Sequence, residues 1–211
     1  MPYIYYSYYT PVSDSISDVT CQEHQLGQSL LLQGLRDLFQ MNLNPDSLEA
    51  LLAKDEFGKP CLPSHPEIHF NITHCKGLVA CAFDSTPIGI DVELPGYFPE
   101  VLINHALSEN EKCFLQAKGS DHPSQQEWFY RFWTLKEAFV KKSGIGVDTN
   151  LKSFCFSFLE TDNSFQPICS DSSVSCYQTM LSSGHILSVC HSLESSNIKL
   201  VSCSEQPGQL K

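Results

Sequence analysis

The chain reads Phe70-Asn71-Ile72-Thr73-His74, then Leu78-Val79-Ala80-Cys81-Ala82-Phe83, then Ile88-Gly89-Ile90-Asp91-Val92-Glu93. In the third segment a branched apolar residue occupies every second position, which is the period of a strand with one buried face. The second segment is a continuous apolar run, and a turn at residues 84–87 separates the two. Asp91 and Glu93 therefore share the other face of the third strand.

These two carboxylates predict a cation site. Side chains two positions apart on a strand point to the same side, with Cα atoms about 6 to 7 Å apart. Two negative charges at that spacing repel each other unless a cation neutralises them. Oxygen ligands favour a hard cation, and Mg²⁺ that keeps waters and shares a substrate phosphate fits best, with Mn²⁺ as a substitute.

Composition describes an ordinary globular chain of 211 residues, with 42% hydrophobic and 18% charged residues. The net charge of -11 argues against nonspecific binding to nucleic acid or to an anionic membrane. The start of the chain lacks a basic segment followed by an apolar one, and no run is long enough to span a bilayer. We expect a cytoplasmic protein that acts as a monomer.

Ten cysteines are scattered along the sequence without CxxC spacing. Several lie inside apolar runs, so we expect free thiols in a reducing compartment rather than a disulfide framework. Cys75 follows His74 and could be a nucleophile. A small residue at a strand end is the simpler interpretation, because no third orienting group is recognisable.

Two stretches have the pattern of long helices. Leucines recur at helical spacing over residues 22–40, and residues 124–143 end with two lysines before Gly144. Ser108 and Glu111 have the spacing of a capping box, which predicts a helix to about residue 118. Strand, helix and strands thus follow one another roughly twice. The pattern predicts an α+β fold of two similar halves, residues 1–95 and 96–211, with a site at their interface.

The second of these helices carries a second group of polar residues. Trp133, Glu137 and Lys141 recur every four positions and so line one helix face. Glu137 and Lys141 could be an ordinary surface pair. However, the segment is rich in aromatic residues, and a glutamate on such a surface needs a partner, either Lys141 or the predicted cation.

Four ordered motifs resemble those of the 4'-phosphopantetheinyl transferases, most closely the surfactin-synthetase type. Besides the first and third segments quoted above, they are Phe57-Gly58-Lys59-Pro60 and Trp133-Thr134-Leu135-Lys136-Glu137-Ala138-Phe139-Val140-Lys141. The resemblance is dense over residues 55–158. It implies a single-chain pseudo-dimer that moves the phosphopantetheine arm of coenzyme A to a serine of an acyl or peptidyl carrier protein, with Mg²⁺, and releases 3',5'-adenosine bisphosphate.

The resemblance also implies roles for particular residues. Asp91, Glu93 and Glu137 match the family's metal carboxylates, with Glu137 or a metal-bound water as the base for the serine proton. Lys141 matches the lysine beside the transferred phosphate, where it could act as an acid. The residues that match coenzyme A contacts are Lys59, Pro60, Thr73, His74 and Lys141. Glu111 matches a further glutamate implicated in metal binding or activation. From composition alone, Lys59 is a solvated turn residue.

The amino-terminal region departs from the family pattern. The family has several basic residues there that hold the 3'-phosphate of coenzyme A, whereas residues 1–53 contain only Arg36, and Gln28 occupies the helical position. We expect weaker coenzyme binding, or compensation by Lys76. Two alternatives stay open: a transferase-like module that binds coenzyme A or a carrier without turnover, and a Mg²⁺-dependent phosphoesterase. The sequence does not distinguish fatty acid, polyketide and nonribosomal peptide carriers.

Overall fold

The computed structural model describes residues 1–118, 122–144, 146, 149–161, 164–193 and 197–203. These residues form an α+β fold, which confirms the predicted class. The helices are α1 (Ile16–Phe39), α2 (Pro45–Leu51), α3 (Glu100–Ala106), α4 (Glu109–Ala117) and α5 (His122–Ser143). The strands are β1 (Tyr3–Tyr8), β2 (Ala53–Lys54), β3 (Pro60–Cys61), β4 (His69–Cys75), β5 (Leu78–Asp84), β6 (Gly89–Glu93), β7 (Phe156–Thr161), β8 (Ser164–Cys169), β9 (Val174–Met180), β10 (Ile186–Ser192) and β11 (Lys199–Ser202).

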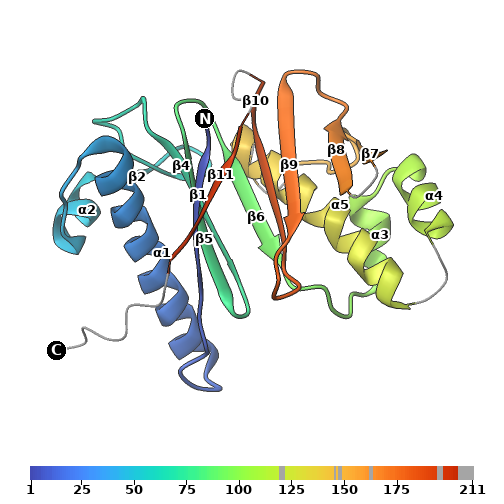
Figure 1. Ribbon diagram of the computed structural model, residues 1–211, viewed down its shortest axis with the longest axis horizontal. Helices are drawn as coiled ribbons and strands as arrows, with labels where there is room; N and C mark the ends of the chain where they lie inside the picture. The colour runs from blue at the N-terminus through green and yellow to red at the C-terminus, as the bar shows by residue number, and fades with distance from the viewer. Residues whose placement is uncertain (119–121, 145, 147–148, 162–163, 194–196, 204–211) are drawn as a thin grey trace.

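Two larger sheets occupy the centre of the molecule. One has the strand order β11-β1-β5-β4 and the other β6-β10-β9, while β2-β3 and β7-β8 are short separate ladders. Figure 1 shows α1 and α5 on opposite sides of these strands. The apolar residues between the two sheets are buried, and they come from β1, β5, β6 and β10 and from the residue just before β6: Ile4, Leu78, Ala80, Ala82, Ile88, Ile90, Val92, Leu187 and Val189.

Strand β5 separates two cores because its side chains alternate in direction. Every residue of β5 is buried. Leu78, Ala80 and Ala82 face the second sheet, whereas Val79 and Phe83 pack in the core under α1. This two-sided burial explains why the sequence here is a continuous apolar run rather than an alternating one.

The sheets do not follow the predicted division at residue 95. Strand β6 lies before that boundary but pairs with β10, with Asp91 opposite Ser188. Strand β11 lies after the boundary but pairs in parallel with β1. Each half of the chain thus contributes one strand to the sheet of the other, so the sequence order of the elements does not reveal their partners.

Helix boundaries differ from the expected ones where capping decides them. Helix α1 begins at Ile16 rather than at 22, because the Ser15 side chain accepts a hydrogen bond from the Asp18 backbone nitrogen. Helix α5 begins at His122, two residues before the predicted start. The predicted capping box at α4 is confirmed between Ser108 and Glu111. Helix α3 and strands β8 and β9 were not predicted.

Two further features of the described residues are the state of the cysteines and the hydropathy of the helices. Each of the ten cysteines lies in the described part of the chain and is a free thiol, as predicted. Among the described helices, none has a stretch apolar and long enough to cross a membrane.

Candidate functional site

A cavity of about 420 Å³ lies where β4, β6 and α5 meet. The residues that line it include most of those selected from the sequence. They are Ile72, Thr73, His74, Asp91, Glu93, Trp133, Glu137 and Lys141. The strand face of Asp91 and Glu93 and the helix face of Trp133, Glu137 and Lys141, both predicted, are thus brought together from segments at least 40 residues apart.

Gly89 sets the distance between β6 and α5. A Cβ at this position would collide with the backbone of α5 at the Ala138 carbonyl oxygen and the Lys142 nitrogen, and would lie 2.9 Å from the Lys141 carbonyl carbon. Only glycine permits this approach. The helix backbone therefore rests directly on the strand, one turn from the side chains that enter the cavity.

Asp91 lies at the centre of the polar contacts. Its Oδ1 accepts hydrogen bonds from the Lys141 ammonium at 2.5 Å and from the Thr73 hydroxyl at 3.2 Å. Lys141 Nζ also lies 3.4 Å from Thr73 Oγ1. Asp91 Oδ2, in contrast, is buried and has no hydrogen-bond partner among the residues that the structure describes. A buried carboxylate oxygen in that condition needs a further donor or a cation.

The three carboxylates disfavour each other's charge. Burial, followed by repulsion from Asp91, raises the pKa of Glu93 to about 7. Burial and Asp91 also raise the pKa of Glu137. Burial raises the pKa of Asp91 as well, although Lys141 opposes this shift. The site holds more negative charge than Lys141 balances, which is the electrostatic condition for binding a cation.

The donor set fits a hard cation, since it offers carboxylate oxygens and the unpartnered Asp91 Oδ2. Within the described residues, however, no three His, Cys, Asp or Glu side chains converge closely enough to hold an ion. The charge of Asp91 is met by Lys141 in this arrangement. The residue types thus suit Mg²⁺, whereas their present arrangement pairs Asp91 with Lys141 and does not bring three of these side chains, among the described residues, around one point.

His74 is held by residues that the sequence did not indicate. Its Nδ1 lies 3.0 Å from Oε2 of Glu23, a buried residue of α1. The Tyr9 hydroxyl donates to the other oxygen, Glu23 Oε1. Glu23 has the spacing of the apolar face of α1, where leucines were the visible signal, so no pattern in the sequence marked it as polar and buried.

Lys59 and Pro60 are not among the residues that line the cavity. The Lys59 ammonium points inward and donates to the carbonyl oxygens of Ile88, at 3.0 Å, and Lys141, at 2.6 Å. Burial lowers the pKa of Lys59 to about 8. Lys59 is therefore neither a solvated turn residue nor a group directed into the cavity. It joins the turn between β2 and β3 to the end of α5.

Glu111 also lies outside the cavity. It is buried and forms an ion pair with buried Lys136, with 3.0 Å between Oε2 and Nζ. Its Oε1 accepts from the Phe156 backbone nitrogen at 2.8 Å. Lys136 donates in addition to the carbonyl oxygens of Leu151 and Phe154. These contacts join α4, α5 and the start of β7, so the position expected to help a metal holds these three elements together.

The remaining candidates lie near the cavity or on the surface. Gln28 is half-buried on α1 and is not a lining residue. Lys76 is exposed in the turn after β4. Burial, with Glu93 and Asp91 nearby, raises the pKa of Cys75 above that of an ordinary thiol. A raised pKa disfavours the thiolate, which argues against the nucleophile hypothesis.

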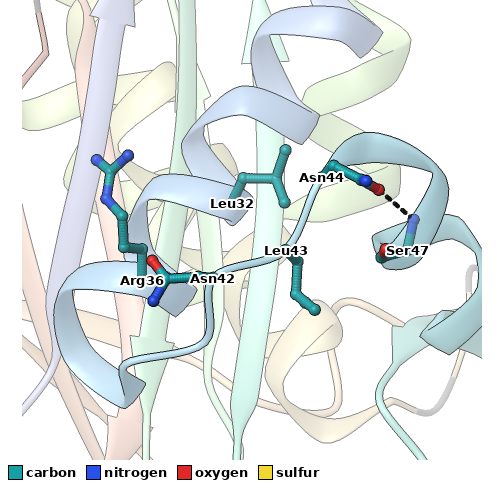
Figure 2. A pocket seen from close by; sticks show the side chains of 6 residues that line it. All are labelled: Leu32, Arg36, Asn42, Leu43, Asn44 and Ser47. Carbon is teal, nitrogen blue, oxygen red and sulfur yellow. Dashed lines mark hydrogen bonds between the residues drawn. The ribbon is translucent and has the colours of Figure 1, made fainter.

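Arg36 does not line this cavity but a second depression in the surface. This depression lies between α1 and α2 and is lined by Leu32, Arg36, Asn42, Leu43, Asn44 and Ser47 (Figure 2). Asn44 accepts from the Ser47 backbone nitrogen at 2.8 Å and so caps α2. Arg36 donates to neighbouring Asp37. The depression shares no residue with the cavity, so Arg36 does not add a basic group to it.

Comparison with known proteins agrees with this geometry. Residues 87–190, which contain Asp91, Glu93, Glu137 and Lys141, match the model of the 4'-phosphopantetheinyl transferase superfamily. This segment, close to half of the chain, belongs to that superfamily. The matched region contains the strand and the helix that meet at Gly89, and it leaves α1, with Glu23, outside.

Several members of the superfamily are similar in sequence. The chain is 36% identical to the 4'-phosphopantetheinyl transferase Sfp of Bacillus subtilis (strain 168) over 143 residues, 68% of this chain and 62% of that protein. It is 32% identical to the 4'-phosphopantetheinyl transferase gsp of Aneurinibacillus migulanus over 148 residues, 70% and 61% respectively. A 4'-phosphopantetheinyl transferase of Bacillus subtilis is 44% identical over 102 residues, 47% and 43%. The matches span less than two thirds of these relatives' lengths.

A solved structure is also similar over part of the chain. The crystal structure of Thermotoga maritima holo-[acyl-carrier-protein] synthase covers 50% of this chain and 61% of its own, at 21% sequence identity and a TM-score of 0.39. A likeness at that level supports no statement about how the two halves of this chain are arranged.

Proposed function

We propose that this protein transfers the 4'-phosphopantetheine group of coenzyme A to a serine hydroxyl of an acyl or peptidyl carrier protein and releases 3',5'-adenosine bisphosphate. The proposal rests mainly on one cavity, which is lined by Thr73, Asp91, Glu93, Glu137 and Lys141. All of these except Thr73 lie in the segment that matches the superfamily model. Phosphoryl transfer depends mainly on positioning the reactants and on neutralising the charge of the phosphate. These side chains can do both.

The cation belongs to this proposal. Asp91, Glu93 and Glu137 would hold Mg²⁺, or Mn²⁺ in its place, because they supply the oxygen ligands that both ions prefer. When bound, the ion neutralises negative charge on the phosphates. Lys141 now donates to Asp91, so we expect its ammonium to become available to a phosphate oxygen once another cation satisfies Asp91.

Glu137 is our candidate for the group that accepts the serine proton. It lines the cavity, so its carboxylate faces the space that the serine hydroxyl would enter, and it would take the proton directly or through a metal-bound water. Lys141 lies one helical turn away and is placed to protonate the leaving phosphate. Coenzyme A is the second substrate, and His74 and Thr73 line the same cavity on the β4 side.

Three broader features remain part of the proposal. The layered arrangement of two sheets with one long helix each is compatible with a pseudo-dimer of two α+β halves. Strand β6 pairs with β10 of the same chain, which is compatible with a monomer that forms the whole site by itself. The cytoplasmic location stays a prediction from the sequence.

One experiment tests the proposed reaction. The protein is incubated with Mg²⁺, coenzyme A and an apo carrier protein, and the carrier is weighed by mass spectrometry. Gain of one phosphopantetheine group supports transfer. Unmodified carriers across a panel of acyl and peptidyl types, with coenzyme A still bound, would instead support a binding module. Release of adenosine bisphosphate without a carrier would support a phosphoesterase.

Two variants make this experiment specific to the cavity. Asp91→Asn removes the charge that Lys141 meets and should abolish transfer, whereas Asp37→Asn removes a carboxylate from the exposed end of α1 and should leave transfer unchanged. Both variants keep the size of the side chain. Retained transfer in Asp91→Asn would contradict the assignment of the site.

A further inference from the structure

Glu23 connects α1 to the candidate site through a buried carboxylate. It is 8% exposed and lies outside the segment that matches the superfamily model. Each of its oxygens has one partner: Oε1 accepts from the Tyr9 hydroxyl, and Oε2 lies 3.0 Å from His74 Nδ1. Among the ion pairs of the described residues, His74 is the sole cationic partner of Glu23.

These contacts determine which ring nitrogen of His74 carries the proton. An ionised carboxylate only accepts hydrogen bonds, so both the Tyr9 hydroxyl and His74 Nδ1 must donate to it. The ring is thereby held by Nδ1, and Nε2 is left for another partner. The His74 side chain is 52% exposed and lines the cavity, so that partner can come from solvent or from a ligand.

The bonds of Tyr9 explain why the carboxylate is fixed. The Tyr9 side chain is buried, and its hydroxyl also lies 3.4 Å from the Cys75 carbonyl oxygen. The Tyr9 backbone nitrogen donates to the Gly77 carbonyl oxygen at 3.1 Å. Tyr9 thus ties the end of β1 to the turn after β4, directly beside His74. A carboxylate anchored in this way holds the ring more rigidly than a solvated one.

We propose that Glu23 is a positioning residue, which holds His74 by Nδ1 and balances its charge, so that Nε2 can donate to a phosphate of coenzyme A. A phosphate oxygen only accepts hydrogen bonds, so this contact requires that Nε2 carry a proton in the complex. The inference rests on the proposed function in one respect, the identity of the ligand.

The contact between Glu23 and His74 also bears on the negative charge around the cavity, which would repel a phosphate. Asp91, Glu93 and Glu137 line the same cavity with one lysine, Lys141. Glu23 adds a further negative charge nearby, and His74 is the group that faces it. Without His74, the buried carboxylate would lack a counter-charge and would repel the ligand. The contributions of Glu23 and His74 to binding should therefore depend on each other.

A double-mutant cycle tests that dependence. Binding of coenzyme A is measured by calorimetry in EDTA, which removes any contribution from a metal, for the wild type, Glu23→Gln, His74→Ala and the double variant. We expect Glu23→Gln to weaken binding about tenfold, the size of one charge-assisted hydrogen bond. In the His74→Ala background the same change should have no weakening effect, or should tighten binding. Equal weakening in both backgrounds would overturn the proposal.

A spectroscopic measurement separates this inference from the proposed function. The ¹⁵N chemical shifts of the His74 ring should report a protonated Nδ1 in the wild type and a changed proton distribution in Glu23→Gln. Identical ring spectra in the two proteins would overturn the inference even if the carrier is modified. Failure of the wild type to bind coenzyme A would defeat the proposed function, and the ring spectra would then decide on Glu23 alone.

Two control variants address stability. Asp37→Asn changes a carboxylate to an amide on the same helix, far along the chain from Glu23, and should leave both binding and the ring spectrum unchanged. Tyr9→Phe removes the donor to Oε1 but leaves the carboxylate, and should weaken binding less than Glu23→Gln. A larger effect of Tyr9→Phe would mean that packing of β1, rather than the Glu23 charge, positions His74.

Discussion

Gly89 and Ala138 are in direct backbone contact, so that β6 and α5 meet without an intervening side chain. The consequence is geometric. Asp91 lies two residues beyond Gly89 on the strand, and Lys141 lies one turn beyond Ala138 on the helix. The close contact brings their side chains to 2.5 Å. The ion pair between Asp91 and Lys141 thus depends on Gly89, which has no Cβ to hold the helix away from the strand.

Gly89→Ala should separate these two elements. A Cβ at Gly89 would overlap two backbone atoms of α5, which cannot move as a flexible side chain can. We expect a loss of about 3 kcal/mol in the free energy of unfolding, measured with urea, and loss of carrier modification. Gly96→Ala is the matched control, since its nearest neighbour would be the Leu94 carbonyl oxygen at 3.8 Å. Equal stability of the two variants would contradict this account.

Sequence patterns predicted the content of the site better than its surroundings. Asp91, Glu93, Glu137 and Lys141 were selected because period two in a strand and period four in a helix determine which side chains share a face, and the cavity is lined by all four. Lys59 was not predicted correctly from composition, since only the tertiary structure places carbonyl oxygens around its ammonium.

Pairing of strands was the other part that local patterns did not predict. The alternation in residues 88–93 identifies a strand, but it does not indicate that the partner is β10, which lies far along the chain. Likewise, β9 carries polar residues on both faces, Ser175 and Thr179 on one and Gln178 on the other, and gave little periodic signal. Glu23 was missed because its polar contacts come from β1 and β4 rather than from its own helix.

Lys59→Met should weaken the junction between the turn at residues 55–60 and α5. The substitution keeps the apolar stem and removes the donor, so the carbonyl oxygens of Ile88 and Lys141 lose a partner. We expect the free energy of unfolding to fall by about 2 kcal/mol. Lys54→Met, which changes an exposed lysine of β2, should have little effect. An equally small effect at Lys59 would show that its bonds add no stability.

Glu111→Gln should destabilise the packing of α4 against α5 and β7 and leave the response to Mg²⁺ unchanged. The change leaves the Lys136 ammonium buried without its counter-charge, which costs about 3 kcal/mol. Adding Lys136→Met should recover part of this loss, because the two residues are coupled. The readouts are urea denaturation and the Mg²⁺ concentration for half-maximal transfer. A rise in that concentration would favour a role for Glu111 in metal binding.

The contribution of Glu93 to the stability of the metal-free protein should be lost as pH rises from about 4.5 to about 7. Glu93 has a pKa raised to about 7, so in this range the folded protein binds a proton that the unfolded chain has released. Unfolding then releases that proton, and higher pH favours it. Asp91 and Glu137 shift in the same direction. Urea denaturation in EDTA at pH 5, 6, 7 and 8 measures the slope.

Glu93→Gln is the test of that assignment, because any excess in the free energy of unfolding of the wild type over the variant should shrink between pH 5 and pH 8. Mg²⁺ should have the opposite pH dependence and stabilise the wild type more at pH 8 than at pH 5, since binding requires deprotonated ligands. A wild type and variant with identical pH profiles would place the titrating group elsewhere.

The pairing of β6 with β10 has a consequence for the newly made chain. Glu93 ends β6, and β10 begins at Ile186. At about 5 to 20 residues per second, the ribosome needs about 5 to 20 seconds to add the intervening residues. During that interval the strand that carries Asp91 lacks its hydrogen-bonding partner, and an unpaired apolar strand can associate with other chains. The segment most closely connected with the proposed chemistry therefore also depends on protection during synthesis.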